Sequence, residues 1–194
     1  MRHHTVGILS VMRIPCEDLT LAFDVWRGSS HSLVGFMPRI HLRQSGKLVY
    51  RCWWRVWWHG LFTMILTKAA IMHHDYFIAY TVSMPQAVRD LVDSRRNCED
   101  IAMQFLIANM TSLPSIYVRG HLEDLGALNG ISTSHSVVKA GHMTMRSDCL
   151  NDLESIFHGV PLIPSRIIVN TASNGWINVP STWFEYVSSD LWKF

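Results

Sequence analysis

The chain has 194 residues, 48% of them hydrophobic and only 16% charged, with a formal net charge of +2. This length predicts one domain or most of one, and the apolar content is ample for a core. The small net charge argues against a dedicated nucleic-acid surface, and four cysteines are too few for a disulfide scaffold in a chain of this length.

The first expected elements are a short strand and a helix. Residues 7–11 form an apolar run typical of a strand. Pro15 is expected to open a helix that ends before Gly28, because proline suits the first turn and glycine follows the last. The apolar side chains of this helix recur at the spacing of one face, and we expect them to point into the core: Leu19, Ala22, Phe23 and Trp26.

Short strands are expected in the next part of the chain, at residues 33–36, 39–41, 48–50 and 62–67. Gly46 marks the turn of a hairpin between the second and the third of them. Residues 68–76 are then expected to form a helix.

Four tryptophans lie within six residues, and this run has two interpretations. They are Trp53, Trp54, Trp57 and Trp58. Core packing is the default interpretation, because aromatic side chains dominate the energetics of protein cores. The alternative is a stacking platform for a sugar ring or a lipid. Since four indoles are more than one sheet face buries easily, we expect at least one to be exposed at the functional cleft.

The second half of the chain continues the alternation of helices and short strands, which indicates an α/β fold. Helices are expected at residues 85–96, 98–109 and 149–157, a strand at 115–119, and a long loop at 120–142. The loop is rich in Gly, Ser and His and has weak periodicity, and residues 159–194 show no clear pattern.

The segment from Arg95 to Met103 carries the densest chemical signal. Asn97 is a good N-cap residue, and Asp100 follows three positions later, as in a capping box. A capped helix with acids at its positive end would account for Glu99 and Asp100 without any catalytic role.

Three blocks of sequence, in this order, point to a more specific interpretation. They are Ala22–Trp26 with Val34–Arg39, then Asn97–Phe105, then Arg146–Asn151. Together they resemble glycosyltransferase family 64, the exostosin-type C-terminal domain, and the tryptophan run is similar to the plant branch of that family. The resemblance covers residues 15–161, whereas 162–194 match poorly. We therefore expect one partial domain over residues 1–194.

The resemblance implies a GT-A fold and the transfer of a sugar, with retention, from a nucleotide sugar to a glycan or a glycosylated sphingolipid. Asp100 falls on the family's catalytic carboxylate, near the anomeric carbon. Arg146 falls on the arginine that contacts the donor diphosphate, a task that suits a planar and permanently charged group. Asn97 matches a residue near the acceptor sugar, a role compatible with N-capping.

The resemblance also implies a disulfide between Cys98 and Cys149, and hence an oxidising compartment such as the Golgi or another part of the secretory pathway. Two unrelated buried thiols are the alternative. Cys16 and Cys52 have no partner that the sequence assigns. Asn109 begins an N-glycosylation triplet, a pattern that is also common by chance.

The sequence departs from the family where manganese would bind. The family has an Asp-rich, Asp-x-Asp-type motif just before a stretch like 14–16, but residues 10–13 read Ser-Val-Met-Arg, and there is no carboxylate between Met1 and Cys16. Glu17 and Asp18 are better explained by the helix start. The adjacent pairs His3-His4 and His73-His74 suit one metal poorly, so no metal ligand is assigned.

The nucleotide-binding first half of the GT-A domain also has no counterpart. We therefore expect an N-terminally truncated, incomplete GT-A fold, namely the acceptor-side half with a mixed sheet and flanking helices. One hypothesis is a glycosyltransferase; the other is a non-catalytic relative that binds a glycan, a glycolipid or a partner transferase, in homo- or hetero-oligomers. The longest uncharged apolar run, residues 56–67, is too short to span a bilayer.

Overall fold

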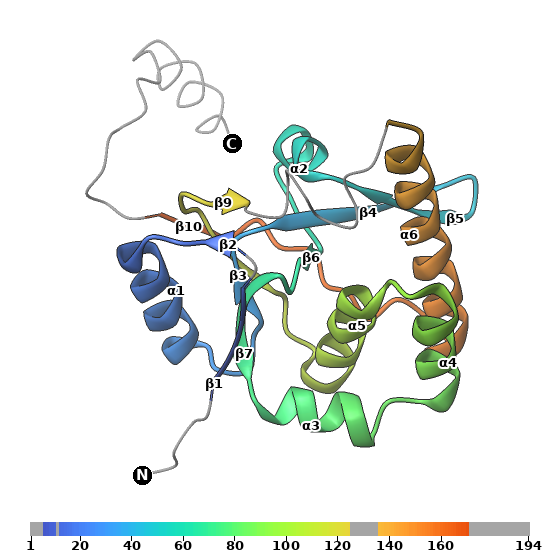
Figure 1. Cartoon of the computed structure of the whole chain (residues 1–194), viewed down its shortest axis with the longest axis horizontal. Coiled ribbons are helices and arrows are strands. Elements are labelled where there is room, and N and C mark those ends of the chain that lie inside the picture. Colours follow the sequence, from blue (N-terminus) through green and yellow to red (C-terminus); the bar gives the residue numbers. More distant parts are fainter. Residues whose placement is uncertain (1–5, 11, 125–135, 171–194) are drawn as a thin grey trace, which may run out of the picture.

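A computed structural model describes residues 6–10, 12–124 and 136–170 as a mixed α/β arrangement (Figure 1). Its main sheet has five strands in the order β1-β7-β3-β8-β10. Their bounds are β1 Val6–Ser10, β7 Ala69–His73, β3 Val34–Gly35, β8 Ile116–Val118 and β10 Ile168–Val169. Strand β7 runs antiparallel to β1 and β3, whereas β8 is parallel to β3 and β10. The mixed sheet with flanking helices confirms the expected α/β class.

Helices lie on both sides of this sheet (Figure 1). On one side is α1 (Cys16–Gly28), which buries Ala22 and Trp26 against β3, β7 and β8. On the other side are α3 (Asp75–Val82), α4 (Gln86–Arg95), α5 (Glu99–Thr111) and α6 (Ser136–Ile156). Both faces of the sheet are therefore covered, and α5 is the most deeply buried of the helices, with no exposed residue from Asp100 to Ala108.

A hairpin and a short third strand form a second sheet beside the first. Its strands are β4 (Pro38–Gln44), β5 (Lys47–Arg51) and β6 (Met64–Ile65), in the order β5-β4-β6. The turn is made by Ser45 and Gly46, both with positive φ, as the glycine at this point predicts.

Helix α6 is attached to the hairpin by its side chains. The Asn151 amide accepts from the Leu48 N–H at 2.9 Å and donates to the Leu48 carbonyl at 2.8 Å. The Ser147 hydroxyl accepts from the Tyr50 N–H at 3.0 Å. These bonds satisfy the edge of β5 and fix α6 against it.

Two small elements complete the described part. Helix α2 (Trp53–His59) follows the hairpin and ends at Gly60, which has the left-handed conformation that favours glycine at this position. Strand β2 (Met12–Arg13) pairs with β9 (Glu123–Asp124), which brings the segment after β1 next to the segment after β8.

The helix expected at residues 68–76 is wrong. Residues 69–73 form strand β7, and helix α3 begins only at Asp75. Ala69 and Ile71 pack on the α1 side of the sheet, whereas Ala70 and Met72 pack on the other. A central strand buried on both faces is a continuous apolar run, which periodicity alone does not distinguish from a buried helix.

Other expectations are corrected in detail. The strand at 62–67 shortens to Met64–Ile65, and Phe23, expected in the core, is 37% exposed. Residues 120–142 are not one loop, because they contain β9 and the start of α6. The helix expected at 149–157 is the C-terminal part of that longer helix. Residues 171–194, for which no pattern was found, lie outside the described residues.

Candidate active site

The centre of the candidate site is a buried ion pair between α5 and α6. Arg146 Nη2 donates to Asp100 Oδ2, and the two residues are only 6% and 8% exposed. Both line a pocket of about 320 Å³. The other lining residues come from β4, β5, the segment after β6, and both helices: Arg39, Tyr50, Cys52, Leu66, Thr67, Lys68, Glu99, His142 and Met143. The structure thus brings together the two residues to which the resemblance assigns roles in sugar transfer.

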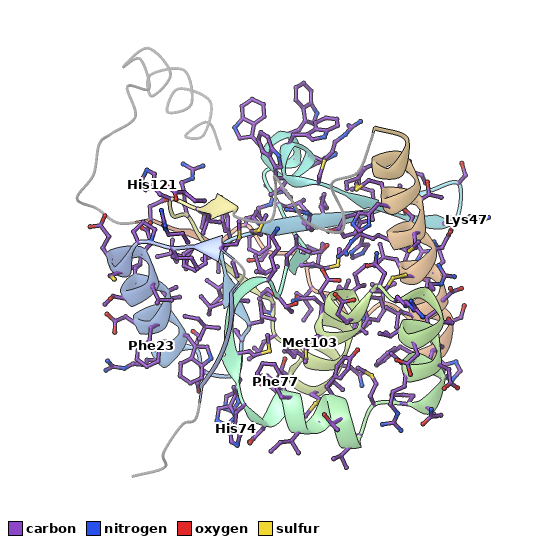
Figure 2. All side chains as sticks on the ribbon, viewed as in Figure 1. Phe23, Lys47, His74, Phe77, Met103 and His121 are labelled. Carbon is purple, nitrogen blue, oxygen red and sulfur yellow. A yellow bond between two sulfur atoms is a disulfide. The ribbon has the colours of Figure 1, made fainter. Side chains whose placement is uncertain are left out.

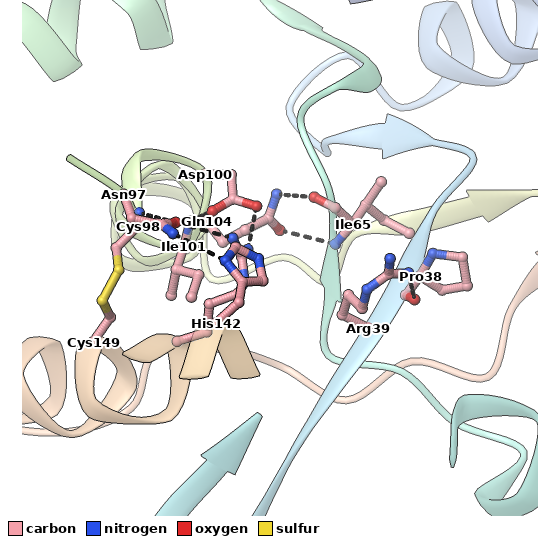
Figure 3. A network of polar contacts seen from close by, with 11 residues as sticks. Pro38, Arg39, Ile65, Asn97, Cys98, Asp100, Ile101, Gln104, His142 and Cys149 are labelled. Carbon is pink, nitrogen blue, oxygen red and sulfur yellow. Dashed lines mark hydrogen bonds and ion pairs between the residues drawn. A yellow bond between two sulfur atoms is a disulfide. The ribbon is translucent and has the colours of Figure 1, made fainter. Parts of the chain in front are cut away.

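The start of α5 is held in an unusual backbone conformation. Arg96 and Cys98 both have positive φ, at 47° and 79°. The Cys98 N–H donates to Asn97 Oδ1 at 2.7 Å, and a disulfide joins Cys98 to Cys149 of α6, with 6.2 Å between the two Cα atoms (Figure 3). The disulfide implied by the resemblance is therefore present. It ties the turn before Asp100 to the helix that carries Arg146.

Asn97 is not the N-cap of α5, contrary to the alternative explanation from the sequence. Cys98 occupies that position, and no side chain caps the helix. Asn97 instead accepts from Arg146 Nη1 at 3.3 Å, and its Nδ2 lies 3.3 Å from His142 Nδ1 (Figure 3). Asp100 Oδ1 accepts from the Ile101 N–H at 2.8 Å and does not reach back, as a capping box would require.

The environment of Arg146 favours its charged form. Burial by itself would lower the pKa of Arg146, but the nearby Asp100 and Tyr50 outweigh that effect, so the pKa is raised. The guanidinium lies over the Tyr50 ring, 4.6 Å from its centroid. Arg146 Nε is buried and has no hydrogen-bond partner within the described part of the chain.

His142 and Tyr50 are site residues that the sequence did not indicate. The pKa of His142 is lowered by burial and by the positive charge of Arg146, which favours the neutral imidazole. Burial raises the pKa of Tyr50, which stays a phenol. His142 stands in a stretch interpreted as a loop, and Tyr50 in an ordinary hairpin strand, so neither had a local signal.

A buried glutamine sets the position of α5 relative to β6. Gln104 Nε2 donates to the Ile65 carbonyl at 2.7 Å, and Gln104 Oε1 accepts from the Ile65 N–H at 3.4 Å (Figure 3). The Ser115 hydroxyl donates to the same oxygen at 3.0 Å. Because these bonds lie one turn after Asp100, they fix the height of its carboxylate above the strand.

The residues present do not fit a manganese site where the family would place one. In β2, shortly after β1, Arg13 forms an ion pair with Glu123 at 3.2 Å, which puts a cation in the segment where the resemblance expects metal-binding acids. Asp18 is buried and accepts from the His121 N–H at 2.8 Å, with its side chain packed against Gly120. Its role is thus to hold the segment after β8, not to cap the start of α1 as expected.

The described residues contain one group that could hold a metal ion, formed by His73, His74 and Asp75, whose ligand atoms lie within 4.8 Å of one another. Hydrogen bonds account for it. His73 Nδ1 accepts from the Asp75 N–H at 3.3 Å, and the Asp75 carboxylate contacts both imidazoles. In the register of the sheet His73 pairs with Val6, whereas Ser10 pairs with Ala69. The group therefore lies at the opposite end of β1 from the expected manganese position.

The core-packing interpretation of the tryptophan run is wrong. All four residues are exposed: Trp53 by 64%, Trp54 by 45%, Trp57 by 72% and Trp58 by 71%. Trp53 and Trp57 line a second, mainly apolar pocket of about 420 Å³. That pocket shares Arg39 with the Asp100 pocket but is not the same cavity. The expected exposure is confirmed, although at a neighbouring pocket.

Three further observations concern expectations about location and modification. Asn109 is exposed near the end of α5, which leaves its glycosylation a prediction. Cys16 is exposed and Cys52 is partly buried, and both are free. Within the described ranges, none of the helices is long and apolar enough to cross a membrane.

Comparison with known proteins gives consistent matches. Residues 4–176 match the Glycosyl transferase family 64 domain. Glycosylinositol phosphorylceramide mannosyl transferase 1 of Arabidopsis thaliana is 38% identical over 167 residues, which cover 84% of this chain and 48% of that protein. Exostosin-2 of Homo sapiens is 33% identical over 158 residues, which cover 78% and 21%. The chain thus spans about half the length of the plant relative and about a fifth of the exostosin.

Proposed function

Because the chain belongs to glycosyl transferase family 64, we propose that the Asp100 pocket is the acceptor-side part of a GT-A sugar-transfer site. In this proposal a hexose passes, with retention, from a nucleotide sugar to a glycan or glycolipid. The observation that carries it is the buried Asp100–Arg146 pair on the wall of a pocket, with Asn97 and His142 beside it. A buried pair adds little net stability, so its presence in a pocket suggests a functional use.

Each residue has a role that follows from its chemistry. The Asp100 carboxylate stabilises positive charge that develops on the sugar ring as the bond to the diphosphate breaks. Arg146 compensates Asp100 in the resting protein and uses the donor it shares with Asn97 for the departing diphosphate. Asn97, with an amide close to neutral His142, holds an acceptor hydroxyl in place.

Among acceptors, we favour a glycosylated sphingolipid over a heparan-type chain. The support is the plant relative, named as a mannosyl transferase acting on glycosylinositol phosphorylceramide, which is more similar to this chain than the exostosins are. A hexose such as mannose is then the sugar transferred. The Cys98–Cys149 disulfide and the Asn109 triplet suit residence in the Golgi or another secretory compartment.

A second candidate function is that of a non-catalytic relative that binds the acceptor. The observation in its favour is Arg13 at the position expected for a metal-binding acid, paired with Glu123. In family members manganese would neutralise diphosphate charge, and its loss costs several kcal/mol of transition-state stabilisation. If this second candidate is correct, the 194-residue chain by itself shows negligible transfer, with or without manganese.

The test combines binding and turnover. The purified chain is titrated with the water-soluble glycan of an inositol phosphorylceramide, and separately assayed with labelled nucleotide hexoses, that acceptor and manganese. Binding that weakens in Asn97→Ala without turnover supports the second candidate. Turnover that falls at least about a hundredfold in Asp100→Asn, with unchanged circular dichroism, supports the enzyme. The assignment of this pocket would be overturned if the chain showed no binding and no turnover. It would also be overturned if the measured values were insensitive to both substitutions.

A further inference from the structure

Helix α2 directs its largest side chains away from the protein. Of its seven residues only Val56 is buried, and the four indoles are between 45% and 72% exposed. Figure 2 shows the rings of this helix projecting beyond the ribbon at the top of the view. A contiguous apolar patch of this kind on a small domain marks a surface that binds something.

The stretch of sequence that contains α2 carries charges of a single sign. Between Asp24 and Asp75 the sequence contains no carboxylate, whereas it contains seven basic residues: Arg27, Arg39, Arg43, Lys47, Arg51, Arg55 and Lys68. Two of these residues are next to the indoles: Arg51 precedes α2, and Arg55 belongs to it. Arg51 Nη2 donates to the neutral Gln44, and Arg55 lies over the Trp54 ring at 4.2 Å. Neither forms an ion pair with a carboxylate in the part of the chain described here.

We propose that α2, with Arg51 at its approach, is a docking surface for a lipid bilayer that carries anionic phosphate headgroups. Indole rings favour the membrane–water boundary, because the ring is apolar and its N–H is polar. Lysine and arginine next to such rings attract anionic lipid phosphates. A bilayer meets both features of the patch at once. A protein partner would have to supply matching carboxylates and deep pockets for four separate rings.

The position of α2 gives this docking a consequence for the candidate site. Cys52 lines the Asp100 pocket, and the next residue, Trp53, begins α2 and lines the neighbouring pocket. A bilayer on α2 would therefore lie close to the mouth of the Asp100 pocket, where the headgroup of a glycolipid acceptor would be presented. Only this consequence rests on the proposed function, since binding to vesicles requires no sugar transfer.

Co-sedimentation with vesicles tests the docking directly. The full chain is mixed with phosphatidylcholine vesicles, and with vesicles in which part of that lipid is replaced by phosphatidylinositol. We expect clearly tighter binding to the anionic vesicles. Trp57→Ser and Trp58→Ser should each weaken vesicle binding about tenfold, because each variant lacks one large apolar side chain that would be buried in the bilayer. Arg51→Gln and Arg55→Gln should each weaken it about fivefold, and only for anionic vesicles at low salt.

The matched control is a pair of equally exposed apolar residues on another helix. Ile78 and Val82 of α3 are 53% and 71% exposed. Ile78→Ser and Val82→Ser should leave vesicle binding unchanged, and all variants should keep the wild-type circular dichroism. Binding that is equal for both lipids, or unaffected by the tryptophan substitutions, would overturn the proposal. So would a wild-type dimer that Trp57→Ser converts to a monomer, because a second copy would then cover α2.

Discussion

In the α5–α6 region the ion pair between Arg146 and Asp100 is buried, whereas in the β2–β9 region the ion pair between Arg13 and Glu123 is mostly exposed. The buried pair sits behind a disulfide and shares hydrogen bonds with Asn97. The exposed pair joins two strands of two residues each. In the α5–α6 region several neighbours fix the position of each charged side chain. In the β2–β9 region little besides the ion pair itself does so.

Under the proposed function, the contrast separates the part of a transferase site that this chain would retain from the metal-binding part. The region that holds the Asp100 carboxylate and Arg146 is supported by a disulfide and by hydrogen bonds to both side chains. The region that would hold a metal has an arginine and a weak pair. If this comparison is correct, removing single groups should have large effects in the first region and small effects in the second.

The largest expected effect comes from breaking the buried pair. Arg146→Met would leave the Asp100 carboxylate buried without its partner, so the free energy of unfolding should fall by about 3–5 kcal/mol. Urea denaturation followed by circular dichroism measures it. Arg43→Met is the matched control, because Arg43 pairs with Glu154 at a more exposed position and its loss should cost less than about 1 kcal/mol. Equal losses in the two variants would contradict the comparison.

The next effect comes from the disulfide that closes the same region. Replacing Cys98 and Cys149 together by alanine should lower the free energy of unfolding by about 2–4 kcal/mol, since the bridge spans 51 positions of the chain. Denaturation of the oxidised wild type and the double variant provides the measurement. Cys16→Ala, which removes a free and exposed thiol, should change nothing. Four titratable thiols in the protein as purified would show that the bridge does not form.

How far the sequence predicted this site depends on the kind of signal each residue carries. Asp100, Arg146, Cys98 and Cys149 stand in blocks that resemble a family, and the structure brings them together. That Asn97 lies beside Arg146 and does not cap α5 could not be predicted. It depends on the left-handed turn at Arg96 and Cys98, which the strong N-cap propensity of Asn97 does not predict.

The fold, like the site, was predicted from the sequence only in part. Elements with clear punctuation, such as the helix after Pro15 and the hairpin around Gly46, were predicted correctly. Strand β7 was not. For the tryptophan run the expected exposure was correct and the default interpretation of core packing was wrong, because burial decides both cases. Ala69–Met72 is buried on two faces and became a strand, whereas the more aromatic residues 53–58 became an exposed helix. Hydrophobicity alone does not say which apolar segment faces the core.

A pH titration adds a third test, of a partly buried histidine in β4. Burial and the nearby charge of Arg43 lower the pKa of His41 in strand β4 from 6.5 to about 4. The unfolded chain therefore binds a proton more readily than the folded chain does. Stability should be complete above pH 6.5 and should fall as the pH drops toward 4, by up to about 3 kcal/mol. Denaturation midpoints across this range measure the slope.

The control for this titration is His41→Gln, whose amide can still bond to the Thr63 hydroxyl that lies 2.9 Å from His41 Nδ1. Its stability should depend less steeply on pH over the same interval. The pKa of His142 is also lowered, so part of the slope should remain in this variant. An unchanged slope in His41→Gln would assign the pH dependence to other groups.

The smallest expected effect concerns the exposed pair, and it is the most direct way to contradict the comparison. Arg13→Ala should lower the free energy of unfolding by less than about 1 kcal/mol, because both side chains of the pair are largely in water and their attraction is screened. Glu123→Ala and the double variant complete a cycle whose interaction energy should be equally small. A coupling of about 2 kcal/mol or more would mean that Arg13 and Glu123 hold the β2–β9 region as firmly as Arg146 and Asp100 hold theirs. The β2–β9 region would then be a firmly held part of the fold, and the contrast between it and the α5–α6 region would have to be abandoned.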